Sequence, residues 1–215
     1  MAAGWDDDPA RAERARAVAA AMRRHLVAVR HAHDDPTGLP PRRAIDLGAG
    51  TGSLSLLLAD LFDEIVLVDT SAGMLEVAAR KVAADSMLRT RIDTLRADLT
   101  STDAAPTLRP AEAAYSLLAL HHIEDAGALL RALHALLVPG GLLLLADLVS
   151  EDGSYHRHDP DFHGHHGFDR QDLDAALRAA GFEPSTYEIA ATTRRRDESG
   201  VERDYPLFLV TARRP

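Results

Sequence analysis

The sequence predicts an α/β fold, in which a seven-stranded, mostly parallel sheet carries helices on both faces and ends in a C-terminal antiparallel hairpin. Five short apolar runs that are typical of strands alternate with stretches of helical periodicity. Two further β-type segments follow, at about 182–192 and 205–212, and the polar stretch RRRDESG (194–200) predicts the hairpin loop between them. A length of 215 residues predicts a single domain, 1–215, with residues 1–38 as an N-terminal helical cap.

The first elements are indicated by capping residues and apolar spacing. Asp8 and Pro9 predict the start of a helix that runs to about His31, and 34–41 is a loop by composition. A strand follows at 43–47, and the next helix places four leucines on one face. The predicted buried residues of these two helices are Val18, Met22, Leu26 and Val29 in the first, and Leu54, Leu57, Leu58 and Leu61 in the second.

Three more strand–helix units are predicted in the same way. The strands lie at 64–68, 91–96 and 113–118, and a helix begins near Ser71, with a weaker one at 103–109. Asp125 is expected to cap a helix that Pro139-Gly140-Gly141 ends, before a fifth strand at 142–146. The expected buried positions of the two main helices are Leu75, Ala78, Ala79 and Val82, then Leu129, Leu130, Leu133, Leu136 and Leu137.

The last helix is predicted at 168–181. Asp169 has the character of an N-cap, Phe168 is placed to pack on Leu173, and Gly181 ends the helix. Its expected buried stripe is Leu173, Ala176, Leu177 and Ala180. In a sheet of this kind the ligand lies at the carboxyl ends of the strands where the strand order reverses, which are here Asp46–Gly52 and Leu118–His122.

The stretch AIDLGAGTG (44–52) predicts a nucleoside-binding turn. After Asp46 it carries Gly48, Gly50 and Gly52 in alternation, and the next strand ends at Asp69, whose carboxylate can accept hydrogen bonds from two ribose hydroxyls. The G-x-G-x-G spacing differs from the G-x-G-x-x-G of dinucleotide-binding proteins. Acidic residues surround the turn, and no Lys or Arg occurs between Arg43 and Arg80, which favours the positively charged S-adenosyl-L-methionine over a pyrophosphate.

These motifs resemble those of the class I S-adenosylmethionine-dependent methyltransferases, from about Arg43 to Val149. The stretch VLVDTSAGML (66–75) is similar to the family's second motif, ADL (97–99) to its acidic turn, and YSLLALHHIED and PGGLLLLAD to its fourth and fifth strands. The resemblance implies a Rossmann-like fold and S-adenosyl-L-methionine as the cofactor. The cofactor site that it implies consists of Asp46, Gly48, Gly50, Gly52, Asp69, Thr70, Met74, Asp98, Leu99 and Leu118. In that site Met74 packs on the adenine, Asp98 accepts from its amino group and the Leu99 N–H donates to it.

Eleven histidines, five of them within 156–166, make a histidine base a candidate for removing the proton of a hydroxyl or amine nucleophile. His121, beyond the fourth strand, and His166, just before the last predicted helix, are the two that we expect to be catalytic. A solvated polar loop and a metal site are the alternatives for the cluster, and no recognised ligand spacing supports a metal.

The expected function is methyl transfer to an oxygen or nitrogen of a small molecule. The alternatives are a cofactor-binding module without turnover and an NAD-binding Rossmann protein. The formal net charge of −9 argues against nucleic acid as a partner, and the absence of cysteine excludes thiolate chemistry. With no signal peptide and no apolar run long enough for a bilayer, we expect a cytoplasmic protein without a membrane partner, as a monomer or homodimer.

Overall fold

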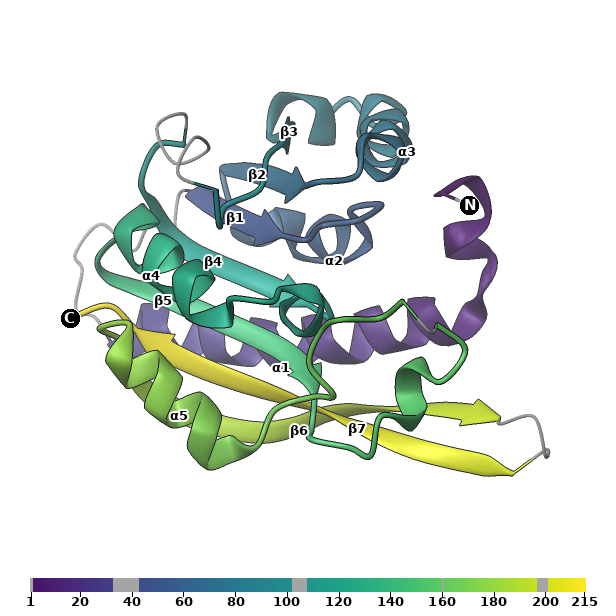
Figure 1. The fold of residues 1–215 in the computed structure, drawn as a ribbon. Helices are drawn as coiled ribbons and strands as arrows, with labels where there is room; N and C mark the ends of the chain where they lie inside the picture. Colours follow the sequence, from purple (N-terminus) through teal and green to yellow (C-terminus); the bar gives the residue numbers. More distant parts are fainter. Residues whose placement is uncertain (1, 33–42, 102–107, 160, 197–200) are drawn as a thin grey trace.

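The seven strands form one sheet in the order β3-β2-β1-β4-β5-β7-β6 (Figure 1). The computed structural model describes residues 2–32, 43–101, 108–159, 161–196 and 201–215. The strands are β1 (Arg43–Leu47), β2 (Glu64–Asp69), β3 (Ile92–Arg96), β4 (Ala111–Leu117), β5 (Leu137–Leu148), β6 (Glu183–Arg196) and β7 (Glu202–Arg213). Only β7 runs antiparallel to its neighbours, β5 and β6. The predicted fold class is therefore confirmed.

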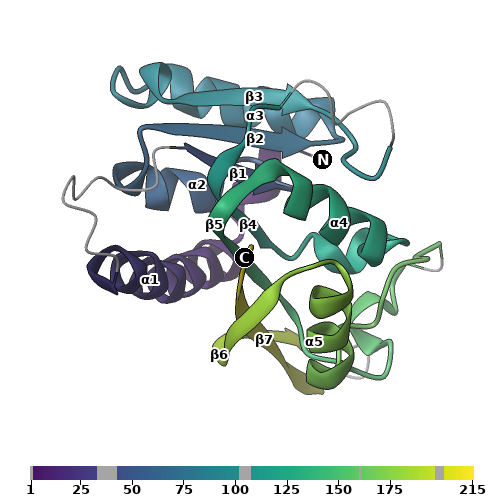
Figure 2. The ribbon, with the colours of Figure 1, turned by 90° about the vertical axis from the view of Figure 1, so that its left-hand side faces the viewer.

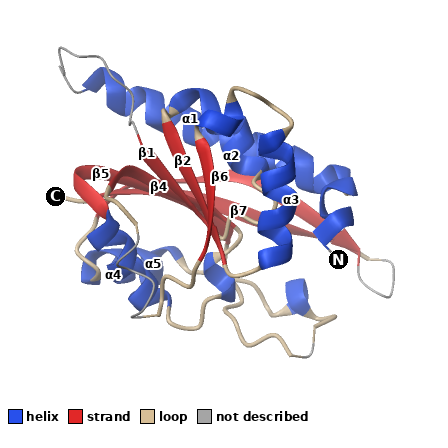
Figure 3. Cartoon of the chain, turned by 90° about the horizontal axis from the view of Figure 1, so that it is seen from above, coloured by secondary structure: helices blue, strands red, loops and turns tan. Residues whose placement is uncertain are grey.

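Helices cover both faces of this sheet (Figures 2 and 3). On one face lie α1 (Pro9–Ala32), α2 (Ser53–Leu58) and α3 (Ala72–Ala83), and on the other lie α4 (Ala126–Leu136) and α5 (Arg170–Ala179). Short 3-10 helices are η1 (Ala2–Asp7), η2 (Ala59–Leu61), η3 (Leu88–Thr90), η5 (Leu120–His122) and η6 (Ser154–His156). No helix among the described residues combines the length and the apolar character that crossing a bilayer requires.

The core divides into two apolar layers because strand side chains alternate between the faces. Met22 of α1, Leu58 of α2 and Ile65 of β2 belong to one layer, and Leu130 of α4 and Leu177 of α5 to the other. The predicted caps also form. The side chains of Asp8, Ser71, Asp125 and Asp169 each accept a hydrogen bond from a backbone N–H in the first turn of the following helix.

Several local predictions were wrong. Leu57 is 37% exposed, because α2 ends at Leu58 and the chain continues as the 3-10 helix η2. Ala79 is exposed at the edge of the buried stripe of α3. Leu137 and Pro139-Gly140-Gly141 belong to β5 rather than to the end of α4, because Gly140 and Gly141 pair with Arg214 beside β7.

The C-terminal hairpin is longer than the sequence predicts. Its strands pair from Glu183 with Arg213 out to Arg196 with Glu202, so Arg194, which we expected in the loop, is part of β6. Cross-strand pairs between arginines and acidic residues extend this ladder, as Arg194 shows with Asp204. The prediction for the loop at 34–41 lies outside the described residues. So do residues 103–107 of the helix predicted at 103–109, while its last two residues, 108 and 109, are not helical.

Candidate active site

A cavity of about 1130 Å³ opens at the carboxyl edge of the sheet, where β1 and β4 diverge. The glycine turn after β1 forms its floor, and the ends of β2 and β4 form two of its walls. The first residues of the chain, in η1 and the start of α1, contribute the remaining side. The crevice that the strand order predicts is therefore present.

The glycine turn fits a ligand that approaches the backbone closely. Gly48 has a φ of +61°, and a Cβ there would lie 2.2 Å from the Cβ of Ala119. Gly50 has a φ of +54° and lines the cavity, and a Cβ on it would meet no described atom within 4 Å. Gly48 is thus required by the packing of the turn, whereas Gly50 leaves open space on the side of the cavity.

The carboxylate of Asp69 holds this turn in place. Its Oδ2 accepts a hydrogen bond of 2.8 Å from the N–H of Gly50, and its Oδ1 accepts one of 2.8 Å from the N–H of Ser71. Ser71, not Asp69, caps α3, because its Oγ accepts from the N–H of Met74. Each carboxylate oxygen of Asp69 can accept a second hydrogen bond, so the group can also bind a diol in the cavity.

Asp46 lies on the cavity wall at the end of β1 and is almost fully buried. Burial raises the pKa of its carboxyl to about 7, against a hydrogen bond from Ser55 that lowers it, and the nearby charge of Asp69 raises it further. The Ser55 Oγ lies 2.6 Å from Asp46 Oδ2 and 2.6 Å from the hydroxyl of Tyr115. A cation bound beside Asp46 would favour its ionised form.

The cavity brings together nine of the ten residues that the sequence places in the cofactor site. Thr70, Met74, Asp98, Leu99 and Leu118 all line it, with Asp46, Gly48, Gly50 and Asp69. Leu118 has a φ of +56°, the one positive value of a non-glycine residue in the described chain. Gly52 does not line the cavity; it begins α2 with a φ of +74°.

Sequence reasoning missed the contribution of the segment before Pro9. The Oδ1 of Asp6 accepts hydrogen bonds from the Oγ1 of Thr51, at 2.8 Å, and the Oγ of Ser53, at 3.0 Å. Its Oδ2 forms an ion pair of 2.6 Å with the Nζ of Lys81. These contacts fasten η1 beside the glycine turn. The run Asp6–Asp8 signals only a helix start, and nothing local in the sequence indicates the distant partners.

The structure corrects which histidine faces the cavity. His122 lines it, whereas the side chain of His121 is buried on the other side of the turn. The Nδ1 of His121 lies 2.5 Å from Oδ1 of Asp147, and its backbone N–H donates to Oδ2 of the same carboxylate. Because Asp147 is itself buried at the end of β5, it draws His121 inward and leaves His122 on the open side.

His166 does not lie on the cavity either. Its side chain is 54% exposed, and its Nδ1 lies 3.7 Å from Oε1 of Glu151. The histidine-rich segment instead packs behind η5, where the N–H of His165 donates to the carbonyl of His121 and the ring of His156 stacks on Phe162. The segment supports the His121–His122 turn rather than covering the cavity.

The electrostatics of the cavity are mixed. Burial lowers the pKa of His122, and the neighbouring His121 lowers it further, which favours the neutral form of the imidazole. Arg11 and Arg14 of α1 also line the cavity. Burial also lowers the pKa of Arg14, whose guanidinium donates to the Oγ1 of Thr193. The site thus offers acidic groups, an imidazole and several basic side chains within one cavity.

The family model and the two curated relatives that this chain matches are all methyltransferases. The sequence model of a methyltransferase domain family matches residues 11–186. The chain is 35% identical over 105 residues to trans-aconitate 2-methyltransferase of Methylobacterium radiotolerans, covering 48% of this chain and 36% of the relative. It is 28% identical over 185 residues to phosphoethanolamine N-methyltransferase 3 of Arabidopsis thaliana, covering 79% and 35%. The chain thus spans about a third of the length of these two curated relatives.

A solved structure shares the fold. The crystal structure of an S-adenosylmethionine-dependent methyltransferase from Clostridium acetobutylicum superposes with a TM-score of 0.67 at 14% sequence identity. The match covers 92% of this chain and 90% of the other. At this sequence identity the comparison supports the arrangement of the helices and strands only. The chemistry has to be argued from the residues of the cavity.

Proposed function

Because this chain belongs to the methyltransferase domain family, we propose that it transfers the methyl group of S-adenosyl-L-methionine to an oxygen or nitrogen of a small molecule. It is an S-adenosylmethionine-dependent methyltransferase, and the nucleophile is the part that the proposal adds. The observation that carries the proposal is the cavity itself, which is lined by the glycine turn, Asp69, His122 and arginines of α1.

The described residues fit the cofactor. Gly50 leaves room for the ligand against the backbone, and Asp69 has lone pairs for two ribose hydroxyls beyond those that the backbone uses. Met74 and Leu99 would contact the adenine, and Asp98 would accept from its amino group. Asp46 would face the positively charged end of the molecule. Thr70, Gly48 and Leu118 shape the same wall, and Gly52 would act indirectly by setting the start of α2.

When bound, the cofactor supplies an electrophilic methyl group, and the residues of this chain position the nucleophile and exclude water. A hydroxyl or amine also has to lose its proton, which a neutral imidazole can accept. His122 is the histidine on the cavity, so we assign it this contact. His121, held by Asp147, then acts as a positioning residue, and His166 contributes through Glu151 at most.

Two observations favour a substrate with an acidic group. Arg11 and Arg14 face the cavity, where a partly desolvated guanidinium binds carboxylate or phosphate well. The names of the two curated relatives specify trans-aconitate and phosphoethanolamine, and both of these molecules carry acidic groups. A small acidic molecule is therefore the class to screen first, and neither a nucleic acid nor a membrane is proposed as a partner. We expect the chain to act as a monomer or homodimer in the cytoplasm.

Isothermal titration with S-adenosylhomocysteine and NAD tests the cofactor assignment. We expect micromolar binding of the former and none of the latter, and tighter binding of NAD would overturn the assignment. An activity screen over carboxylates, phenols, alcohols and amines tests the nucleophile. His122→Gln should lower kcat by roughly 10²–10⁴ while cofactor affinity changes little. His166→Gln should keep a near-normal kcat. A strongly reduced kcat in His166→Gln, with a near-normal kcat in His122→Gln, would identify His166 as the base instead.

A further inference from the structure

Three histidines from two separate segments meet beside the cavity. His121 and His122 belong to η5, and His156 ends η6. Each offers one ring nitrogen, and the three nitrogens lie within 4.8 Å of one another. Zinc binds histidine at about 2.0–2.1 Å, so the nitrogens of a tetrahedral site lie about 3.4 Å apart. Such a site needs a contraction of up to about 1.4 Å, which small rotations about the side-chain bonds would have to supply.

His121 has the arrangement of a metal ligand supported by a carboxylate. Its Nδ1 is engaged by Oδ1 of Asp147 at 2.5 Å, which fixes the orientation of the ring and leaves Nε2 as the ligand atom. Metal-binding histidines generally donate their second ring N–H to a carboxylate or carbonyl, because this fixes the tautomer and raises the basicity of the ligand. Asp147 also accepts from the backbone N–H of His121 and of Leu148, so the carboxylate is itself held firmly.

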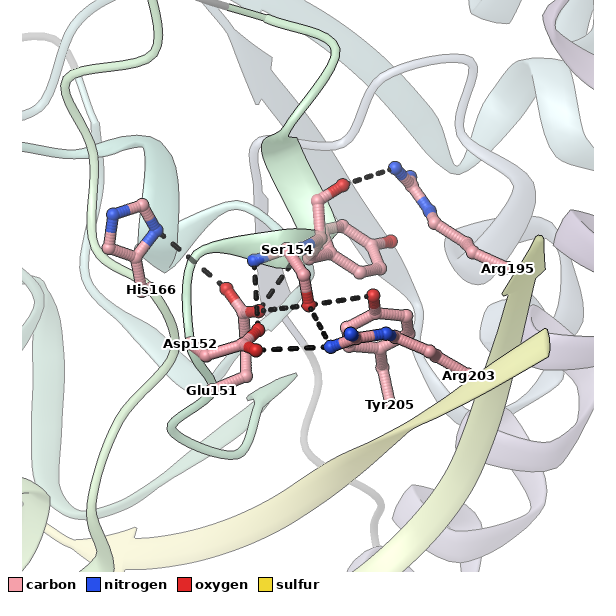
Figure 4. A network of polar contacts seen from close by, with 8 residues as sticks. Glu151, Asp152, Ser154, His166, Arg195, Arg203 and Tyr205 are labelled. Atoms are coloured by element: carbon pink, nitrogen blue, oxygen red, sulfur yellow. Dashed lines mark hydrogen bonds and ion pairs between the residues drawn. The ribbon is translucent and has the colours of Figure 1, made fainter. Parts of the chain in front are cut away.

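A polar network anchored on the C-terminal hairpin holds η6, the 3-10 helix that ends at His156; Figure 4 shows the network around Ser154. The Oγ of Ser154 lies 2.9 Å from the hydroxyl of Tyr205 and donates to Glu151. Glu151 also accepts from the N–H of Tyr155, and Arg195 of β6 donates to the carbonyl of Tyr155. The residue next in the chain is His156, so its backbone is fixed on both sides of η6.

One ring nitrogen of His156 has no hydrogen-bond partner among the described residues. Its Nε2 is buried and makes no hydrogen bond within the described part of the chain. A buried polar atom without a partner costs free energy, and a bound ion is one of the things that can satisfy it. Stacking on Phe162 explains the orientation of the ring but does not satisfy this nitrogen.

We propose that His121, His122 and His156 bind one divalent transition metal, with Zn²⁺ as the best match. Three imidazole ligands suit zinc, copper or nickel rather than magnesium or calcium, which prefer oxygen ligands. Three protein ligands leave a fourth tetrahedral position open, as in catalytic rather than structural zinc sites. Because His122 lines the cavity, that open position faces the proposed substrate.

This site would change how the nucleophile loses its proton. A hydroxyl group bound to zinc would have a strongly lowered pKa and could lose its proton to solvent water, so His122, as a metal ligand, would not have to accept that proton. This part of the inference rests on the proposed function, whereas metal binding does not. A binding experiment therefore separates the two, because the site can exist whether or not the methyl acceptor is a hydroxyl.

The test uses the full chain, purified without a histidine tag and stripped with a chelator. It is titrated with Co²⁺, whose visible absorption reports tetrahedral coordination by nitrogen, and then with Zn²⁺ in competition. The variants are His122→Ala, His156→Ala and the milder His156→Gln, and the matched control is His163→Ala, an exposed histidine of the same segment. The melting temperature of each metal-free variant shows whether it folds.

We expect one Co²⁺ per chain with a tetrahedral spectrum that Zn²⁺ abolishes, in the wild type and in His163→Ala. Affinity should fall at least 100-fold in the folded variants of His122 and His156, and Zn²⁺ should raise the melting temperature of the wild type but not of these variants. No binding by the wild type would overturn the site. So would unchanged stoichiometry and affinity in His122→Ala and His156→Gln, because the ion would then be held elsewhere.

Discussion

The carboxylate of Asp69, at the end of β2, accepts a hydrogen bond of 2.8 Å from the backbone N–H of Gly50, in the turn that follows β1. Two adjacent strands are thereby joined at their carboxyl ends, and the joint lies in the cavity wall. A residue proposed to bind the ribose thus also fixes the backbone against which the cofactor would lie.

Replacing Asp69 by alanine should weaken binding of S-adenosylhomocysteine by about 2–4 kcal/mol, because two ribose hydroxyls and the Gly50 N–H lose a charged acceptor. Isothermal titration measures the change, and circular dichroism checks the fold. Ser71→Ala is the matched control, since it removes the cap of α3 without touching the carboxylate. If folded Asp69→Ala binds S-adenosylhomocysteine with an affinity within a factor of two of the wild type, Asp69 stabilises the backbone turn but does not bind the ribose.

Gly50→Val should reduce cofactor affinity by a similar amount. The side chain would occupy the open space that Gly50 leaves, and its φ of +54° disfavours any β-branched residue. Gly140→Val, at a φ of +81° in β5, is the control for backbone strain away from the cavity. Comparable losses of stability with loss of binding only in Gly50→Val would fit the proposal, whereas equal affinities in the two variants would contradict it.

The stability of the ligand-free protein should depend on the ionisation of Asp46. The pKa of about 7 in the folded state lies above the ordinary value of an aspartate, 3.8, so the neutral acid favours the folded state. This contribution is complete below about pH 4 and is lost as pH rises towards 7, on the order of 4 kcal/mol in the free energy of unfolding. Above pH 7 it causes no further change.

Urea denaturation across pH 4–8 measures this dependence, and Asp46→Asn should flatten the curve, because the amide does not ionise. The Ser55 hydroxyl can bond to the amide as it does to the acid, and the Tyr115 hydroxyl holds Ser55 in place, so the variant should fold. An unchanged pH profile in Asp46→Asn would assign the dependence to other groups. Binding of a positively charged cofactor should also release protons near pH 7 from the wild type but not from this variant.

Asp6→Ala should loosen η1 and weaken cofactor binding by about tenfold, close to 1.4 kcal/mol. The side chain connects η1 to Thr51, Ser53 and Lys81, and its loss removes the ion pair that holds this side of the cavity. Hydrogen exchange in residues 2–8 should rise in the variant. Asp7→Ala changes an exposed neighbour and should match the wild type in cofactor affinity and in hydrogen exchange. If the two variants behave identically, η1 does not contribute to cofactor binding.

The strands and helix caps could be predicted from the sequence because their signals are local. Ser71, Asp125 and Asp169 each cap a helix through a neighbouring backbone N–H, which a short window of sequence reveals. The glycine turn is equally local. Leu57 was misplaced because its exposure depends on where α2 changes to a 3-10 helix, and a hydrophobic pattern does not show that change.

The orientation of the two histidines could not be predicted, because it is decided by a contact between distant residues. Asp147 on β5 binds the ring of His121, and β5 reaches that position only through the pairing of the sheet. The same holds for His156, which approaches His122 through the loop after β5 and the hairpin that supports it. The sequence shows a histidine-rich segment, but it does not show which histidine of that segment lies close to His121 and His122.

The position of β7 between β5 and β6 sets the order in which this chain can fold during synthesis. When β6 leaves the ribosome, its only neighbour in the sheet has not yet been made, and β5 still presents an unpaired edge. Both edges are satisfied together when β7 inserts. Arg195 and Tyr205, which support the loop of His156, take their places in the same step. The cofactor half of the cavity can therefore form early, while the histidine half is completed by the last strand.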